Sequence, residues 1–170
     1  MRCIAESVPA PYLLRAGPEP PPPGGSLRPF VPSDLPRVME IVAEALREHY
    51  EPALYLSLSR QWPEGFLVAV DPDGAVVGFL LGVTQVEREG RILMFAVDRG
   101  HRTRGIGARL MSAFLDRCRE RGLARTTLEV RVSNATALRF YTRFRYSVVD
   151  LLRGYYSDGE NGYQMARDLP

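Results

Sequence analysis

The sequence contains no lysine: all 22 of its basic residues are arginines, which against 20 acidic residues give a formal net charge of +2. Without a lysine amine, the chain has no side chain for Schiff-base chemistry or self-acylation, and phosphate binding must rely on arginine or the backbone. Charges this evenly balanced produce no general field for nucleic acid or an anionic membrane surface, so neither is expected as a partner. Any anion site must therefore be local.

Cysteine is also scarce. Cys3 and Cys118 lie far apart and belong to no Cys-x-x-Cys or Cys/His spacing, so we expect neither a disulfide framework nor a metal site. No apolar run is as long as a membrane span, and the first residues lack the continuous apolar segment of a secretion signal. These absences predict a cytoplasmic location.

Proline is concentrated in one stretch, GPEPPPPGG at residues 17–25. Such a stretch sustains neither a helix nor a central strand and favours an extended polyproline II linker. With 170 residues, 45% of them hydrophobic, the chain can form one domain with a sizeable core. We therefore expect a tail and linker over residues 1–25 and a single domain over residues 26–170.

Hydrophobic periodicity predicts the order strand, helix, helix, three strands, helix, strand, helix and two strands. The first helix is expected to begin at Ser33, whose side chain can cap it. The strands are expected at residues 27–31, 66–70, 75–86, 92–97, 126–132, 147–152 and 163–167, and the other helices at 52–60, 104–122 and 134–144. Strand–helix–strand units joined to hairpins indicate an α/β domain with a mixed sheet and helices on both faces.

The segment RGHRTRGIGARLM, residues 99–111, places four arginines and two nearly adjacent glycines, Gly105 and Gly107, at the start of an expected helix. Glycine lets a ligand approach the backbone closely, and the first-turn N–H groups of a helix bind anions, phosphate above all. Taken alone, a glycine-rich turn before a helix is more often only a connection. The segment is thus a candidate phosphate site that needs support from the rest of the chain.

The strand TTLEVRV directs Glu129 to the face opposite Leu128 and Val130. Burying a carboxylate is costly unless it is paired or used, so Glu129 is either in an ion pair, with Arg131 or another basic group, or a base. On the next helix, Tyr141 is either a core side chain or a proton donor. Asn134 is either a helix cap or a ligand contact.

Together, the segments ILMFAV, RTRGIG and LEVRVSNATALRFY resemble motifs of the GNAT superfamily of acyl-CoA-dependent N-acyltransferases. The resemblance covers about residues 26–168. Within the superfamily, the chain is similar to the protein N-terminal acetyltransferases, nearest to archaeal NatA-like and bacterial RimI-like enzymes. The segments EHYEPALY and RGYYSDGENGYQM carry that similarity. Arg145-Tyr146 departs from the family, where a Gly-Phe pair is common, and affects the geometry of one turn.

The resemblance implies a GNAT fold, a mixed and mostly antiparallel sheet with a V-shaped splay between the fourth and fifth strands. Acetyl-CoA, the implied cosubstrate, would lie in the splay with its pyrophosphate on the turn at residues 102–108. The cofactor-binding residues implied are Phe95, Ala96, Val97, Arg102, Thr103, Arg104, Gly105, Ile106, Gly107, Ala108, Asn134 and Tyr141.

The implied activity is direct transfer of acetyl from acetyl-CoA to the α-amino group of a protein or peptide. Glu129 would take the proton of the amine, and Tyr141 would protonate the departing thiolate. The residues implied for peptide binding are Glu48, Tyr50, Tyr155 and Tyr156, with Glu48 a rival base.

Protein N-termini are the expected partners, and the ribosome or its proteins are further candidates. Two alternatives stay open: a GNAT enzyme for a small amine or a lysine side chain, and a non-catalytic acyl-CoA-binding module. The sequence does not indicate the oligomeric state.

Overall fold

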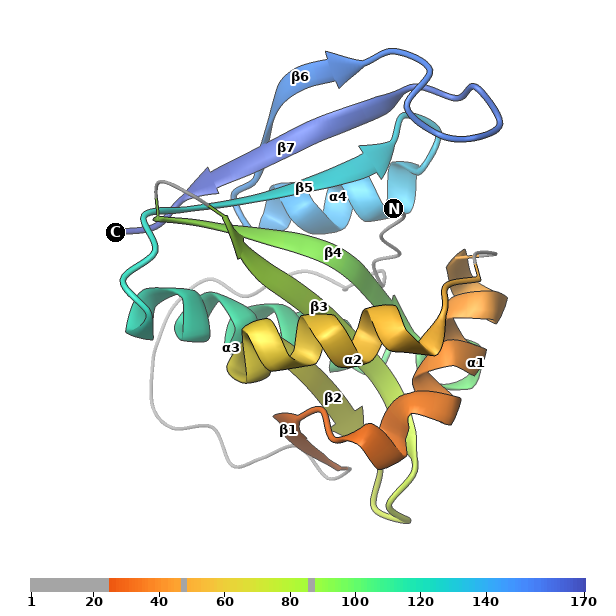
Figure 1. Cartoon of the computed structure of the whole chain (residues 1–170). Helices are drawn as coiled ribbons and strands as arrows, with labels where there is room; N and C mark the ends of the chain where they lie inside the picture. The colour runs from red at the N-terminus through yellow and green to blue at the C-terminus, as the bar shows by residue number, and fades with distance from the viewer. Residues whose placement is uncertain (1–24, 47–48, 86–87) are drawn as a thin grey trace.

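The computed structural model describes residues 25–46, 49–85 and 88–170, which form a seven-stranded sheet between two layers of helices (Figure 1). The predicted order of strands and helices is confirmed, and most boundaries agree within two or three residues. The tail and linker expected over residues 1–25 lie outside the described residues except for Gly25. The strands are β1 (Ser26–Pro29), β2 (Phe66–Val70), β3 (Val76–Gln85), β4 (Glu89–Val97), β5 (Arg125–Arg131), β6 (Ser147–Leu152) and β7 (Gly162–Asp168), and the α-helices are α1 (Leu35–Leu46), α2 (Pro52–Gln61), α3 (Ile106–Glu120) and α4 (Ala135–Arg143).

The strands follow the order β1-β2-β3-β4-β5-β7-β6, and neighbouring strands are antiparallel except for the parallel pair β4 and β5. The pairing of β4 with β5 runs only from Glu89↔Arg125 to Ile92↔Leu128, although β4 continues to Val97. Figure 1 shows the two strands diverging beyond that point. The V-shaped splay is therefore confirmed, and it divides the sheet into β1–β4 and β5–β7–β6.

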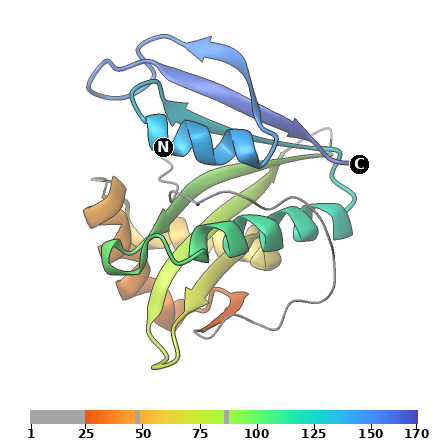
Figure 2. The same cartoon turned by 180° about the vertical axis from the view of Figure 1, so that it is seen from behind.

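Helices α1 and α2 cover one face of the sheet, and α3 and α4 cover the other (Figures 1 and 2). On the first face, Val38 and Ile41 of α1 belong to a buried cluster with Phe79 and Met94 of the sheet. Within the described parts of the chain, none of the helices has the length and hydrophobicity of a membrane-spanning segment.

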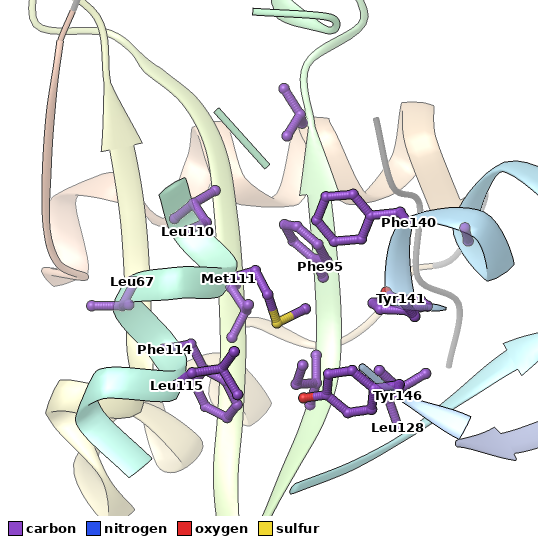
Figure 3. Packing of buried hydrophobic residues seen from close by; sticks show 14 of the residues in the cluster. Leu67, Phe95, Leu110, Met111, Phe114, Leu115, Leu128, Phe140, Tyr141 and Tyr146 are labelled. Carbon is purple, nitrogen blue, oxygen red and sulfur yellow. The ribbon is translucent and has the colours of Figure 1, made fainter. Parts of the chain in front are cut away.

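The second face holds a larger cluster (Figure 3). Met111 and Phe114 of α3 and Phe140 of α4 pack there with Phe95 and Leu128 of the two diverging strands. Strand β4 contributes buried residues to both clusters, as its doubly apolar sequence predicted. The divergence thus occurs in the middle of the core, with well-packed helices on either side.

The start of α1 differs from the prediction. Ser33 lies inside a short 3-10 turn, Pro32–Asp34, and the carboxylate that accepts a backbone N–H there belongs to Asp34, from Val31 at 2.9 Å. Arg28 of β1 donates to both oxygens of the same carboxylate, at 2.7 and 2.8 Å. The prediction of a Ser33 cap is wrong because Asp34 both caps the turn and ties it to β1.

Gly82 of β3 lies directly against α3. A Cβ at this position would be 2.2 Å from Cε2 of Phe114, whose ring is fully buried and cannot move aside without repacking. Gly82→Ala is therefore expected to lower the free energy of unfolding by about 1–3 kcal/mol. Urea unfolding measures the change, with Ser112→Ala on the exposed face of α3 as the control. A Gly82→Ala protein as stable as the wild type would contradict this packing.

Cys118 faces the core from α3 and is fully buried. Desolvation raises the pKa of its thiol to about 12. Only the thiolate reacts with disulfide reagents, so Cys118 is expected to be inert at pH 8 in the folded protein. Thiol titration of a Cys3→Ser variant tests this: we expect no reaction until denaturant is added, and rapid labelling of the native protein would contradict it.

Candidate active site

The open part of β4 begins where its pairing with β5 ends. Phe95, Ala96 and Val97 lie there with buried side chains, so the backbone is what this stretch presents along its edge. In a strand, alternate residues direct their N–H and C=O groups toward the same edge. This edge can therefore hydrogen-bond an extended ligand that carries amides of its own.

The turn before α3 has the backbone conformation of an anion site. Thr103 and Gly105 have φ of 64° and 76°, and Gly105 immediately precedes the helix. A Cβ at Gly105 would meet nothing within 4 Å, so steric crowding is not the reason for a glycine there. Glycine is favoured because it adopts the positive φ at little cost. The first hydrogen bond of the helix runs from the N–H of Arg109 to the carbonyl of Gly105, at 3.0 Å, and the preceding amides form the positive end of α3.

Asp98 holds the loop that leads into this turn. One carboxylate oxygen accepts the N–H of Gly100 at 3.0 Å and lies 2.7 Å from Nδ1 of His101. The other accepts from Arg37 of α1 at 2.8 Å. The bond with His101 and the other donors hold the pKa of Asp98 below its usual range, although burial opposes them. This network fixes the turn to α1. Neither Asp98 nor Arg37 was predicted from the sequence.

These two features match the parts of acetyl-CoA. An extended arm with amides suits the open edge of β4, and a pyrophosphate suits the turn at the N-terminus of α3. Arg102 and Arg104 add positive charge to the turn, and Nε of Arg102 donates to the carbonyl of Val97 at 3.1 Å, which links the turn to the strand. The residues present therefore fit the cosubstrate.

Glu129 of β5 is buried, with only 3% of its side chain exposed, and it forms an ion pair with Arg91 of β4. Nη2 and Nε of Arg91 lie 2.9 and 3.1 Å from Oε2 of Glu129. The expected pairing with Arg131 is wrong, because Arg131 is bound by Asp158 and Glu160 of the β6–β7 loop. The alternative of another basic group is correct.

Arg91 is the main site residue that the sequence analysis missed. The predicted strand began at Ile92, whereas β4 begins at Glu89. Desolvation acts against the charged form of Arg91, but the hydrogen bond and charge of Glu129 outweigh it and raise the pKa of Arg91. The guanidinium therefore stays charged in this partly buried position.

The two tyrosines of the β6–β7 loop have different environments. Tyr155 is 36% exposed, and its hydroxyl accepts from Nη2 of Arg91 at 3.2 Å. Tyr156 is buried, with the guanidinium of Arg131 stacked 4.0 Å from its ring centre. Tyr155 therefore lies at the surface of the site, whereas Tyr156 anchors the loop. Contact of either with a peptide stays a prediction.

Tyr141 is fully buried on α4, and its ring packs edge-to-face with Phe140 and Tyr146 (Figure 3). Its packing role is confirmed, and its catalytic role stays a prediction. Its cluster includes Leu128 and Val130, whose side chains lie on the face of β5 opposite Glu129. Glu129 and Tyr141 thus approach the splay from opposite faces of the sheet.

The remaining predicted residues lie at the ends of helices. Asn134 caps α4: its Oδ1 accepts the N–H of Ala137 at 3.0 Å, which confirms the cap, while its contact with the cofactor stays a prediction. Tyr50 precedes α2, with its ring packed edge-on against Tyr55. Glu48 lies outside the described residues.

Comparison with known proteins agrees with this geometry. The acetyltransferase (GNAT) family matches residues 35–146. An uncharacterized N-acetyltransferase of Methanocaldococcus jannaschii is 37% identical over 85% of this chain and 92% of its own length. An N-alpha-acetyltransferase of Sulfolobus acidocaldarius is 32% identical over 81% of this chain and 88% of its own length. The crystal structure of Ard1 from Thermoplasma volcanium superimposes with a TM-score of 0.82 at 44% identity, covering 86% of this chain and 98% of that one. The chain therefore belongs to the acetyltransferase (GNAT) family and is an acetyl-CoA-dependent N-acetyltransferase.

Proposed function

We propose that the enzyme acetylates the α-amino group of protein N-termini. The observation that carries the proposal is the buried Glu129, held beside the splay on the face where α1, α2 and the β6–β7 loop lie. A carboxylate in this place can accept a proton from an amine that enters between those elements. The N-alpha-acetyltransferase of Sulfolobus acidocaldarius, at 32% identity, supports the same assignment.

When bound, acetyl-CoA supplies an activated acetyl group as a thioester. The chain would bring the amine to the thioester, accept one proton from the amine and donate one proton to the sulfur. The backbone of Phe95, Ala96 and Val97 would hold the arm, and the N–H of Val97 would stabilise negative charge that develops on the carbonyl oxygen. Holding both reactants at the splay contributes to the rate by itself, because it removes the entropic cost of their meeting.

The residue that would accept a proton and the residue that would donate one lie on opposite faces of β5. Glu129, directly or through one water, would take the proton that the amine nitrogen loses as the amide bond forms. Tyr141 would give a proton to the sulfur as the bond between carbonyl carbon and sulfur breaks. Transfer of one proton from Glu129 to solvent and of one from solvent to Tyr141 restores the enzyme. The transfer is direct and forms no covalent bond to the protein.

The test is incubation with acetyl-CoA and peptides that begin with Ser, Ala, Met-Leu or Met-Glu, beside a peptide with a blocked N-terminus and an internal lysine. Fragmentation mass spectrometry locates the acetyl group. Acetyl on the α-nitrogen is the expected result and also gives the preferred first residue. Acetyl on lysine alone, or on no peptide, would contradict the proposal.

A further inference from the structure

Arg91 binds Glu129 through one carboxylate oxygen only. Both hydrogen bonds from Arg91 end on Oε2, and in the described residues no side chain donates to Oε1. Oε1 is therefore the oxygen at which the carboxylate can accept a proton. The same guanidinium also donates to Tyr155, so the base and the β6–β7 loop share one cation.

The position of Arg91 is fixed at both ends. It lies one residue before the end of the β4–β5 pairing, opposite Thr127, so its side chain starts at the point where the strands begin to diverge. Its guanidinium is held by Glu129 and Tyr155, and the loop that carries Tyr155 is itself anchored by Arg131 through Asp158 and Glu160. Arg91 cannot easily swing away when a substrate arrives.

A fixed cation beside the base changes which form of an amine the site favours. A buried carboxylate without a partner would attract an ammonium group as its counter-ion. An ammonium nitrogen has no lone pair and cannot attack a carbonyl, so such an ion pair would be unproductive. With Arg91 already neutralising Glu129, an incoming ammonium gains no ion pair and is repelled by the guanidinium.

We propose that Arg91 is a positioning and specificity-determining residue that makes the site accept the neutral form of the substrate amine. The proposal rests on the proposed function and concerns the same site. It implies a preference for α-amines over lysine side chains. With reference pKa values of about 7.7–8.0 and 10.4, roughly a tenth of α-amines are neutral at pH 7, against roughly one lysine side chain in 2,500.

The experiment compares the wild type with Arg91→Met, which removes the charge, and Arg91→Lys, which keeps it. Arg117→Met serves as the control, since Arg117 pairs with Glu120 at the surface of α3. Each enzyme is assayed from pH 6.5 to 9.5 on a peptide with an unblocked N-terminus and no lysine, and on an N-terminally blocked peptide with one lysine. Separate kcat and KM values are obtained for both.

For Arg91→Met we expect KM for the unblocked peptide to fall several-fold at pH 6.5, because the ammonium now pairs with Glu129. Its kcat at pH 7 should fall about tenfold and recover toward pH 9, where the amine is neutral. The preference for the α-amine over lysine should fall at least fivefold. Arg91→Lys should keep most of the preference and the wild-type pH dependence, and Arg117→Met should match the wild type.

An Arg91→Met enzyme with wild-type KM, pH dependence and preference would overturn the inference. If Arg91→Met has no measurable rate, Arg91→Lys decides: a wild-type preference supports the role of the charge, and a lost preference overturns it. A wild type that acetylates only lysine would overturn the proposed function and this inference together. A wild type selective for the α-amine with an equally selective Arg91→Met would overturn this inference alone.

Discussion

Glu129→Gln is expected to lower kcat for a peptide substrate by about 10²–10⁴-fold, because an amide keeps the shape of the carboxylate but cannot act as a base near neutral pH. The dissociation constant of acetyl-CoA should change less than threefold, since the features that fit acetyl-CoA lie along β4 and at the start of α3. Steady-state kinetics and calorimetric titration with acetyl-CoA in the absence of peptide measure the two effects separately. Loss of turnover with retained binding is the signature of a base.

The matched control is Glu120→Gln, an exposed glutamate of α3 that pairs with Arg117. Its kcat should equal that of the wild type. Thermal unfolding is recorded alongside, because the Glu129→Gln substitution leaves the partly buried Arg91 without its counter-ion. If Glu129→Gln kept more than a tenth of the wild-type kcat while folded, the base would lie elsewhere, and Glu48 would be the next residue to replace.

Tyr141→Phe is expected to lower kcat by about 10²-fold while the fold stays intact. The substitution removes the hydroxyl that would protonate the sulfur and retains the ring that packs against Phe140 and Tyr146. The pre-steady-state rate of amide formation in a rapid-quench experiment should fall by the same factor as kcat. A fall in kcat without a fall in that rate would point to product release instead.

Tyr146→Phe provides the control from the same cluster (Figure 3). The hydroxyl of Tyr146 lies 2.8 Å from Oγ1 of Thr126, in a buried hydrogen bond. Removing it should cost about 1 kcal/mol of stability and leave kcat unchanged. Equal losses of kcat in both variants would show that Tyr141 acts through packing, not as an acid.

Local features of the fold were predictable because each depends on neighbours in the sequence. The doubly apolar run at Ile92–Val97 indicated a central strand, and the spacing of Leu110, Met111 and Phe114 indicated the buried face of α3. The turn before α3 was also predictable from local sequence, since Gly105 supplies a backbone conformation needed just before the helix, while its binding of phosphate stays a prediction. The splay came from the family resemblance, because nothing in the separate patterns of β4 and β5 specifies where their pairing stops.

Contacts between distant segments were not predictable in this way. Arg91 and Glu129 are 38 residues apart, and their pairing depends on the register of a parallel strand pair. Arg131, two residues from Glu129, was the nearer candidate on the same face, and only the return of the β6–β7 loop shows that it is already bound. The same holds for Asp98, whose partner Arg37 comes from the first helix.

The proposed reaction requires that amine and thioester meet at the splay between β4 and β5, with Glu129 on one side and Tyr141 on the other. The most direct test is a crystal structure with a conjugate in which CoA is joined through an acetyl bridge to the α-nitrogen of a peptide. We expect the conjugate to run along β4 beyond Ile92, with its pyrophosphate at residues 102–108 and its α-nitrogen on the Glu129 face. A conjugate bound away from the splay, or with its α-nitrogen on the α3–α4 face, would contradict it.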